Sequence, residues 1–331
     1  MEPLSFSAMV RDFGQYTADM GDCPPIFLLG ATSIVGYNVA LRRGGEVKCL
    51  VTSRSRHRAV AGWPRLALHD DEDLGVFCRG LPAGSVIIYC DAVCDVAKCE
   101  EDPAWAININ LGNLARTLEK LPPDARLVYM SSDHVFGNDG IFNESSEPCP
   151  ISRYGAMRVR AEQMALSRAG SLVIRSGLPI GRSVDGRSGH LEWLQYRLGR
   201  GLPVTIIEDE ARVPVPLDHL ADRIVALAKS GIVGIRHVVT DSLMSRPALA
   251  QHLKRYFQLP GTLVYRLRRE QPAPHLGRIH LVTQYCDTLA AALPCPLTLI
   301  SRRPWPAGES KADGNNLPPL SIHLAADCYD G

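Results

Sequence analysis

The chain has 331 residues, of which 46% are hydrophobic and 21% are charged, and this composition is typical of a globular protein with a sizeable core. Lysine and arginine together number 36 and aspartate and glutamate 35, so the charge balance gives no reason to expect a nucleic-acid or anionic-membrane partner. The sequence contains no apolar run long enough to span a bilayer, and residues 1–23 lack the basic-then-apolar order of a signal peptide.

The ten cysteines stand mostly alone at the ends of apolar runs. Cys90, Cys94 and Cys99 form a cluster, but their spacings of four and five residues do not match those of a zinc site. We therefore expect buried thiols and no metal. Cysteines used in this way are typical of a reducing compartment, which favours a cytoplasmic location.

Residues 1–23 are weakly patterned, and we treat them as an N-terminal extension. From Pro24 onward, short apolar runs of the kind that form buried strands alternate with segments of helical periodicity. Such alternation indicates βαβ units, and therefore an α/β fold with a doubly wound parallel sheet and helices on both faces. The predicted strands are 26–30, 47–52, 65–69, 85–90, 126–131 and 171–175, and the predicted helices are 34–43, 103–120 and 153–168.

The sequence changes in character after Gly177. A polar, glycine-rich loop over 181–190 follows, and from Ser301 onward proline, glycine and polar residues predict a loose tail. We therefore divide the chain into the extension (1–23), a core (24–178), a smaller second part with some segments returning to the core (179–300), and a flexible tail (301–331). In the second part, the predicted helices are 191–199, 217–229 and 244–257, and the predicted strand is 203–208.

The first predicted strand runs directly into the sequence GATSIVG, residues 30–36. A dinucleotide-binding loop needs a tight turn, close backbone approach to the pyrophosphate, and a helix N-terminus aimed at the phosphates. Gly30 and Gly36 occupy the first and last glycine positions of such a loop, and Ser33 takes the middle one. The position of this glycine loop at the first strand–helix junction favours a dinucleotide site over a plain turn between a strand and a helix.

The end of the second predicted strand bears on the choice of cofactor. Its sequence TSRSRHR carries Arg54, Arg56 and Arg58, and it has no acidic residue to bind the ribose hydroxyls of NAD. The planar fork of arginine suits a 2′-phosphate, so the sequence favours NADP(H). The alternative is a solvated basic loop.

Two later stretches carry a family resemblance. YMSSDHVFGNDG (129–140) ends the fifth predicted strand, and SRYGAMRVRAEQ (152–163) places Tyr154 on the next helix. Together with DEARVPVPLDHLAD (209–222), they resemble the dTDP-4-dehydrorhamnose reductase (RmlD-like) family of extended short-chain dehydrogenase/reductases, which also includes the methionine adenosyltransferase regulatory β subunit. The resemblance covers roughly residues 24–293 and implies a Rossmann-type core with a small C-terminal α/β substrate-binding part.

The resemblance implies a catalytic group of Ser132, Tyr154 and Arg158. Ser132 would hydrogen-bond to the substrate carbonyl, and Tyr154 would donate a proton as hydride arrives from the nicotinamide. Arg158 stands where the family has a lysine that binds the nicotinamide ribose and lowers the pKa of the tyrosine. Arginine supplies a charge but cannot give up a proton. Either Tyr154 remains usable, or the protein keeps the fold and has changed its chemistry.

His134 replaces the family's usual tyrosine beside the substrate, and it would be either a new acid/base or a wall residue. Arginines on segments expected to face the substrate would suit a diphosphate or a carboxylate, although each alone could be structural. The loop 181–190 could close over a ligand. The residues expected to bind the cofactor are Gly30, Thr32, Ser33, Ile34, Val35, Gly36, Ser53, Arg54, Asp70, Ala92, Tyr154 and Arg158, and those expected to bind the substrate are Asp133, His134, Phe136, Arg175, Arg187, Trp193 and Arg212.

We therefore expect an NADPH-dependent biosynthetic reductase of a carbonyl, most simply a 4-keto sugar nucleotide, with Tyr154 as proton donor. One alternative is an NADP-binding regulatory or non-catalytic subunit of a partner enzyme. Another is a tailoring enzyme of secondary metabolism with altered chemistry. The expected partner is a small molecule such as a nucleotide sugar, with no nucleic acid and no membrane, and the sequence permits a homodimer.

Overall fold

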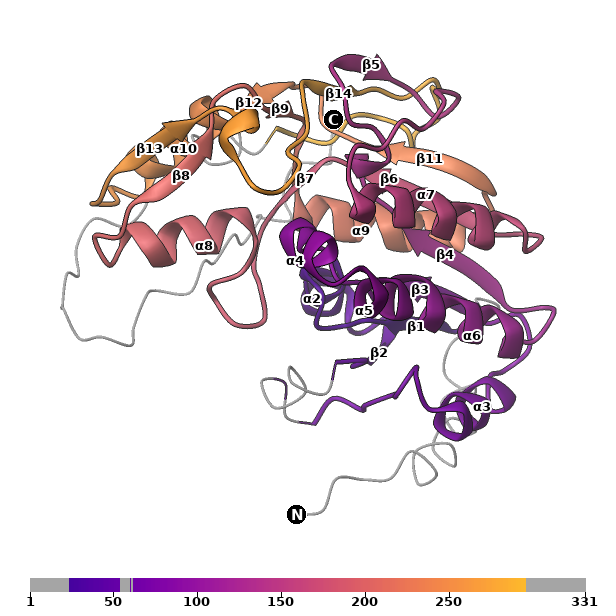
Figure 1. The fold of residues 1–331 in the computed structure, drawn as a ribbon. Helices are drawn as coiled ribbons and strands as arrows, with labels where there is room; N and C mark the ends of the chain where they lie inside the picture. Colours follow the sequence, from indigo (N-terminus) through magenta and orange to yellow (C-terminus); the bar gives the residue numbers. More distant parts are fainter. Residues whose placement is uncertain (1–23, 54–59, 61, 296–331) are drawn as a thin grey trace, which may run out of the picture.

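The computed structural model describes residues 24–53, 60 and 62–295 (Figure 1). The predicted N-terminal extension, the three arginines at 54, 56 and 58, and the predicted tail lie outside the described residues. At its centre is a parallel sheet of six strands in the order β11-β6-β4-β3-β1-β2. The strands are β1 (Ile26–Leu29), β2 (Val47–Leu50), β3 (Val86–Tyr89), β4 (Arg126–Met130), β6 (Leu172–Ser176) and β11 (Gly234–Val238).

Helices cover both faces of this sheet (Figure 1). Alternate strand residues point to opposite faces, so Leu28 and Ile88 join one apolar cluster while Phe27 and Ile87 join the other. The first cluster is closed by α2 (Ile34–Arg43) and α9 (Leu217–Lys229). The second is closed by α3 (Asp71–Arg79), α4 (Val96–Glu101), α5 (Pro103–Ile107), α6 (Asn113–Lys120) and α7 (Arg153–Leu166), with a π-helical turn at Asn108–Gly112 between α5 and α6.

The second part of the chain builds a smaller body around a third apolar cluster. Its strands form pairs: β7 (Leu178–Ile180) with β10 (Pro214–Pro216), β8 (Val204–Ile207) with β13 (Leu263–Arg266), and β9 (Ala211–Arg212) with β12 (Met244–Ser245). The remaining elements are β5 (Gly140–Phe142), which pairs with β14 (Ile279–Leu281), the helices α8 (Gly189–Leu198) and α10 (Arg246–Tyr256), and the 3-10 turns η3 (Asp133–Val135) and η4 (Arg268–Glu270).

The predicted doubly wound parallel sheet is confirmed, but the predicted strand over 65–69 is wrong. Only Arg65 pairs with the sheet, in an isolated parallel bridge to Val51. Pro64 lacks a backbone N–H, and Asp70 already caps the next helix by accepting hydrogen bonds from the Glu72 and Asp73 amides. The apolar run is therefore too short to form a ladder.

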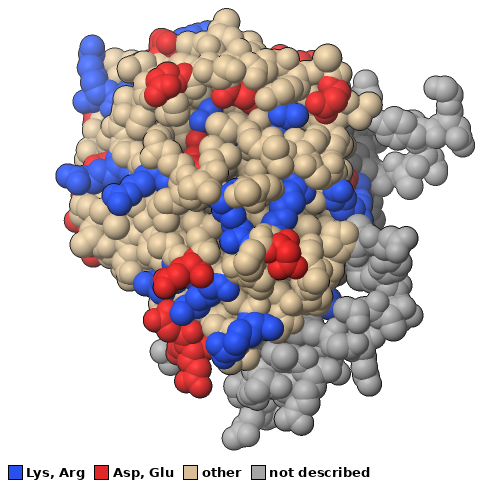
Figure 2. Space-filling model, turned by 90° about the vertical axis from the view of Figure 1, so that its right-hand side faces the viewer, with Lys and Arg blue, Asp and Glu red and all other residues tan. Residues whose placement is uncertain are grey.

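The described surface carries both signs of charge. On the face shown in Figure 2, basic and acidic side chains are interspersed among uncharged ones. Among the described helices, none combines the length and the apolar character that a membrane crossing requires.

Candidate active site

The glycine loop lies at the carboxyl end of β1, between its neighbours β2 and β3. The chain leaves β1 toward β2 and later returns to the other side of β1 as β3, so this is a switch point, where doubly wound sheets bind ligands. Gly30 has a φ of 85°, and a Cβ atom there would lie 2.6 Å from the backbone nitrogen of Asp91. A Cβ atom at Gly36 would lie 2.2 Å from the carbonyl oxygen of Gly30. Both positions therefore need glycine.

Ser33 gives the middle position of the loop a definite role. Its Oγ accepts a hydrogen bond of 3.0 Å from the Gly36 amide and so caps the N-terminus of α2. Thr32 is buried, and Ile34 and Val35 form the first turn of the helix. The first turn of α2 carries no acidic residue, so its amides can face a phosphate. The arrangement fits a pyrophosphate of a dinucleotide.

Asp91 joins the ends of three elements beside this loop. Thr52 Oγ1 donates to Asp91 Oδ1 over 2.5 Å, and Asn113 Nδ2 donates to Asp91 Oδ2 over 3.2 Å. Burial raises the pKa of this carboxyl group, while the two hydrogen bonds oppose the rise. Ala92 follows directly and is half-buried. The sequence did not single out Asp91, although its place at a strand end was a usable signal.

Tyr154 and Arg158 lie on the buried face of α7, one helical turn apart as their spacing predicts. Tyr154 is only 3% exposed and Arg158 only 6%. Arg158 Nε donates to the Tyr154 hydroxyl over 2.9 Å, and Nη1 donates to the Tyr129 hydroxyl over 2.7 Å and to the Met130 carbonyl over 3.2 Å. Nη2 donates to Cys94 Sγ over 3.5 Å. This arginine is thus a fixed part of the site rather than a surface residue.

The electrostatics of the pair are set by burial. Burial raises the pKa of Tyr154 well above its usual range, and the neighbouring Arg158 charge opposes this rise without cancelling it. Burial alone would lower the pKa of Arg158, but its contacts with Tyr129 and Tyr154 raise it instead. At neutral pH the site therefore holds a protonated phenol beside a permanent cation.

The segment that follows β4 packs against the first turn of α7. Ser132 caps η3: its Oγ accepts from the His134 amide over 3.3 Å and donates to Asp133 Oδ1 over 3.1 Å. A Cβ atom at Gly155 would lie 2.2 Å from the His134 carbonyl oxygen, so glycine after the tyrosine permits this close approach. The fold thus brings the Ser132 segment and Tyr154 together.

His134 lies edge-on to the Tyr154 ring, with 5.1 Å between the ring centroids and 74° between the planes. Burial lowers the pKa of His134 to about 4. Its Nδ1 is buried and makes no hydrogen bond to another described residue. A neutral imidazole in this position favours the interpretation of His134 as a wall residue.

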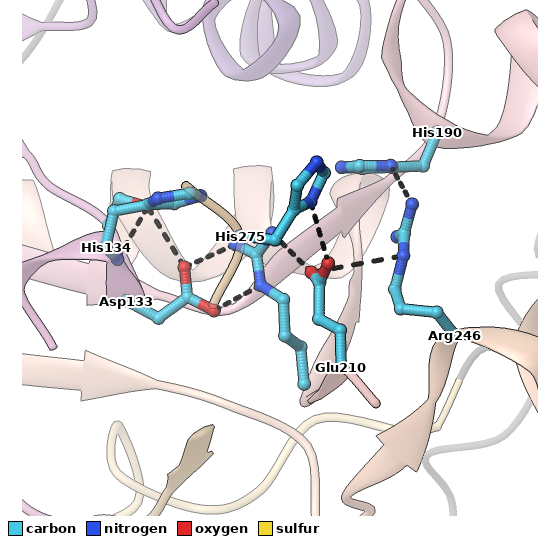
Figure 3. A network of polar contacts seen from close by, with 8 residues as sticks. Asp133, His134, His190, Glu210, Arg246 and His275 are labelled. Atoms are coloured by element: carbon cyan, nitrogen blue, oxygen red, sulfur yellow. Dashed lines mark hydrogen bonds and ion pairs between the residues drawn. The ribbon is translucent and has the colours of Figure 1, made fainter. Parts of the chain in front are cut away.

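A buried network of charges extends from Asp133 into the second part of the chain (Figure 3). Arg212 makes two hydrogen bonds to Asp133, of which the one from Nε to Oδ2 is 2.7 Å. Arg212 Nη1 also lies 3.7 Å from Glu210 Oε1. Glu210 in turn faces Arg246 at 4.0 Å and His275 at 3.3 Å. Although burial opposes it, these partners lower the pKa of Glu210 to about 2.

The outer end of the network is formed by two helix N-termini. Arg246, the first residue of α10, donates from Nη2 to Nδ1 of His190 at the start of α8, over 3.0 Å. Arginine can only donate, so this contact fixes His190 with its proton on Nε2. Figure 3 shows the His190 and His275 rings pointing toward each other above Glu210.

Two of the predicted substrate residues lie in the core instead. Phe136 is fully buried and stacks on Phe142, with ring centroids 4.2 Å apart. Arg175 is fully buried as well, and its Nη2 lies 2.7 Å from Glu162 Oε2. The expectation that Arg175 faces the substrate is therefore wrong, because its guanidinium is paired with Glu162 and packed over the Phe136 ring.

The other predicted residues are less firmly placed in a site. Arg187 is exposed in the loop before α8 and lies 4.0 Å from Asp185, and Trp193 is 38% exposed beneath the Arg197 guanidinium. Asp70 caps α3. As cofactor or substrate ligands, these residues and Ser53 stay predictions. Arg54 lies outside the described residues.

Sequence reasoning missed Tyr129, Cys94 and Arg246, which contact the candidate residues or the network next to them. Tyr129 and Cys94 contact Arg158 only because β3 and β4 are neighbours beneath α7. Arg246 looks like an ordinary first-turn residue until α8 is placed beside it. Within the ranges that the structure describes, no group of three or more histidine, cysteine or acidic side chains could hold a metal ion.

A parallel doubly wound sheet, a glycine loop at its switch point, and a YxxxR helix whose first turn packs against the serine segment after β4 define a Rossmann-type fold of the short-chain dehydrogenase/reductase kind. The chain belongs to the family described as the RmlD substrate binding domain, whose family model matches residues 25–278.

Curated relatives agree with this family. The chain is 28% identical over 232 residues to a dTDP-4-dehydrorhamnose reductase of Mycolicibacterium smegmatis, a match that covers 67% of this chain and 65% of that protein. It is 27% identical over 167 residues to a probable low-salt glycan biosynthesis reductase of Haloferax volcanii, covering 48% of this chain and 55% of the relative. The chain thus spans between about half and two thirds of the length of these relatives.

Solved structures match a larger share of this chain than the two curated relatives do. A hypothetical dTDP-4-dehydrorhamnose reductase from Sulfolobus tokodaii superposes with a TM-score of 0.65 at 26% identity, over 78% of this chain and 91% of that one. A dTDP-4-dehydrorhamnose reductase from Bacillus anthracis, solved in complex with NADP, superposes with a TM-score of 0.70 at 19% identity, over 85% and 98% of the two chains. At 19% identity, the similarity to the Bacillus anthracis structure shows only a shared fold.

Proposed function

We propose that the protein is an NADPH-dependent reductase that acts on the keto group of a sugar nucleotide, with Tyr154 as the proton donor. The observation that carries this proposal is the buried Tyr154 hydroxyl held by Arg158 Nε at 2.9 Å, on a helix whose first turn packs against the Ser132 segment. Its support comes from relatives named as sugar-nucleotide reductases and from the YxxxR pair at the family's catalytic positions.

Each group of residues would have a separate role in cofactor binding or catalysis. Bound NADPH would supply the hydride that reduces the carbonyl carbon. The amides of the α2 N-terminus, exposed by Gly30 and Gly36, would hold the pyrophosphate. Ser132 would orient the carbonyl oxygen, and Tyr154 would protonate it as negative charge develops there. We assign the 2′-phosphate to the segment around Ser53 and Arg54.

Burial and Arg158 act on Tyr154 in opposite directions. Burial raises the pKa of Tyr154, which keeps the phenol protonated at neutral pH but weakens it as an acid, whereas the fixed Arg158 cation stabilises the phenolate that forms when the proton leaves. Catalysis by proton transfer from a positioned side chain is worth about 10²–10⁴-fold in rate. Removal of the Tyr154 hydroxyl should therefore cause a large, measurable loss of turnover rate.

The test is Tyr154→Phe, assayed by NADPH oxidation with dTDP-4-dehydrorhamnose and with other dTDP-4-keto sugars. We expect turnover to fall by about 100-fold or more, while NADPH affinity, measured by fluorescence titration, stays within a few-fold. Full activity in the Phe variant would show that the proton comes from another group, and His134 would be examined first.

A second candidate is an NADP-binding subunit without turnover. The observation that favours it is Arg158 itself, because a guanidinium cannot relay a proton as the family's lysine can. This form of the protein would bind NADPH with the affinity of the reductase, copurify with a partner enzyme, and leave every dTDP-4-keto sugar unchanged. Turnover by the purified chain decides between the two functions.

A further inference from the structure

Two histidines at the outer end of the charge network each have a ring nitrogen that the network does not use. Figure 3 shows the rings of His190 and His275 pointing toward each other above Glu210. His190 is half-buried and the His275 side chain is 35% exposed, so neither ring is sealed in the core. Each Nδ1 atom contacts the network, and among the described residues neither Nε2 atom has a hydrogen-bond partner. The two Nε2 atoms are therefore available to a ligand.

Arg246 fixes the tautomer of His190. Its Nη2 lies 3.0 Å from His190 Nδ1, and since arginine can only donate, Nδ1 must accept. Burial and the charges of Arg246 and Arg212 lower the pKa of His190, which keeps the ring neutral at neutral pH. The single proton of this ring is therefore on Nε2, which makes that atom a hydrogen-bond donor.

Glu210 fixes His275 in the opposite way. Its Oε2 lies 3.3 Å from His275 Nδ1. Although burial opposes it, the charged partners of Glu210 lower its pKa to about 2, so this carboxylate is ionised and can only accept. His275 Nδ1 therefore carries a proton, and in the neutral ring Nε2 is an acceptor. The network thus presents one donor and one acceptor on facing rings.

A donor that faces an acceptor selects a hydroxyl group. A hydroxyl can accept from His190 Nε2 and donate to His275 Nε2 at the same time. A phosphate or carboxylate oxygen can only accept, so it would meet the lone pair of His275, and an ammonium group can only donate. The two arginines of the network are matched by two acids, which leaves no net charge to attract an anion.

The same network leads back to the proposed proton donor. Asp133, which binds Arg212, is followed by His134, and the His134 ring lies 5.1 Å from the Tyr154 ring. A substrate with its keto group at Tyr154 could therefore extend along the network toward His190.

We propose that His190 and His275 together bind a hydroxyl group of the substrate and so determine which substrates are accepted. The inference rests on the proposed reductase function. The hydroxyl belongs either to the sugar ring or to the deoxyribose of the nucleotide, which share this chemistry, and the experiment distinguishes the two.

Asparagine variants remove the two Nε2 atoms and leave the network in place. In His190→Asn, the side-chain oxygen can still accept from Arg246. In His275→Asn, the side-chain amide can still donate to Glu210. The free energy of unfolding by urea should therefore stay close to that of the unmodified protein. His69→Asn is the matched control, because His69 is exposed in the turn before α3, and its kinetics should equal those of the unmodified protein.

Substrate analogues identify the hydroxyl. We compare kcat/KM for dTDP-4-dehydrorhamnose with that for analogues lacking the 2- or 3-hydroxyl of the sugar or the 3′-hydroxyl of the deoxyribose. The unmodified protein should lose about five- to tenfold with one of these analogues, because a hydrogen-bonded hydroxyl is removed. Each Asn variant should lose a similar factor with the parent substrate, mainly through KM. Since the contact is then already absent, that analogue should cost the variants at most about two-fold more.

The outcomes distinguish this site from the function on which it rests. If the unmodified protein turns over no dTDP-4-keto sugar, the reductase function fails and the hydroxyl site falls with it. If the unmodified protein is active but loses nothing with any of the three analogues, the hydroxyl site alone is overturned. It is also overturned if an analogue costs the two Asn variants its full factor, because the hydroxyl is then bound by other residues.

Discussion

Arg158 is held by four hydrogen bonds to four different residues, from the Tyr154 hydroxyl to Cys94 Sγ. A lysine at this position has one compact ammonium group and could not reach all of these acceptors together. The site is therefore built around a fork, and the family's lysine is replaced by a residue with a wider reach. Substitutions that keep or remove the charge of Arg158 separate the contribution of its charge from that of its shape.

We expect Arg158→Met to lower both turnover and NADPH affinity by about tenfold or more, because a charge-assisted hydrogen bond is worth about 1.5–3 kcal/mol. Arg158→Lys retains the charge next to Tyr154 and should keep or raise the reductase rate. Steady-state kinetics and cofactor titration on both variants make the comparison. A Lys variant as inactive as the Met variant would show that the site depends on the guanidinium fork.

His237 predicts how stability depends on pH. The residue is 1% exposed, its Nδ1 lies 2.8 Å from the Val282 carbonyl oxygen, and burial lowers its pKa to about 4. The unfolded chain, with a histidine pKa near ~6.5, binds the proton more readily than the folded protein does. The contribution of the neutral His237 side chain to the free energy of unfolding is therefore fully present above pH ~6.5. It is lost as the pH falls toward 4.

The measurement is the free energy of unfolding by urea at several pH values. His237→Gln keeps a donor for Val282 but removes the titration, so the slope between pH 6.5 and pH 4 should flatten by up to about 1.4 kcal/mol per pH unit. His280→Gln, in the neighbouring strand β14 and only half-buried, is the control and should leave the slope as it is. An unchanged slope in the His237 variant would contradict the assignment.

At the scale of elements, the junction of β1 and α2 depends on one close approach. Gly36→Ala would place a methyl group 2.2 Å from the Gly30 carbonyl oxygen, and backbone cannot move aside as a flexible side chain can. We expect a loss of about 1–3 kcal/mol in the free energy of unfolding and weaker NADPH binding, measured by urea unfolding and by fluorescence titration.

A matched control lies at the other end of the same helix. Gly45 is exposed just beyond α2, and a Cβ atom there would have open space around it. Gly45→Ala should leave stability and NADPH affinity nearly unchanged. Equal behaviour of the two variants would mean that the Gly30–Gly36 contact is not a constraint.

The longer elements could be predicted from periodicity, because their burial pattern is written into contiguous residues. The predicted helices over 34–43 and 217–229 have the bounds of α2 and α9. The two-residue strands β9 and β12 could not be predicted, since each is defined only by its partner across the molecule. The apolar run over 65–69 misled for the same reason: pairing with a neighbour, not composition, makes a strand.

The candidate site shows the same division. The spacing of Tyr154 and Arg158 is local, so the sequence placed both on one helical face. Arg175 had the right residue type on the right strand, but its side chain points to Glu162 in the core. Only the arrangement of sheet and helices distinguishes an arginine that faces a ligand from one that neutralises a buried acid.

At the scale of the whole molecule, the Asp133–Arg212 pair connects the core to the second part of the chain. Asp133 belongs to η3, directly after Ser132, and Arg212 belongs to β9. Their side chains are 0% and 6% exposed. Arg212 also faces Glu210, and Glu210 faces Arg246 at the start of α10. The network therefore fixes the orientation of the second part relative to the site by charge as well as by packing.

A double-mutant cycle on this pair tests the connection. Arg212→Met leaves the Asp133 carboxylate buried without its cation, which should cost about 3–5 kcal/mol in the free energy of unfolding. Asp133→Asn should cost less, because Arg212 keeps Glu210 as a partner. The variant with both changes should be less destabilised than the sum of the two single losses, since no buried charge of the pair is then left alone.

The exposed pair Arg42–Asp222, between α2 and α9, is the control, and Arg42→Met should cost about 1 kcal/mol or less. Urea unfolding of all variants supplies the four energies, and strictly additive losses at Asp133 and Arg212 would show that the two parts are held together by packing alone.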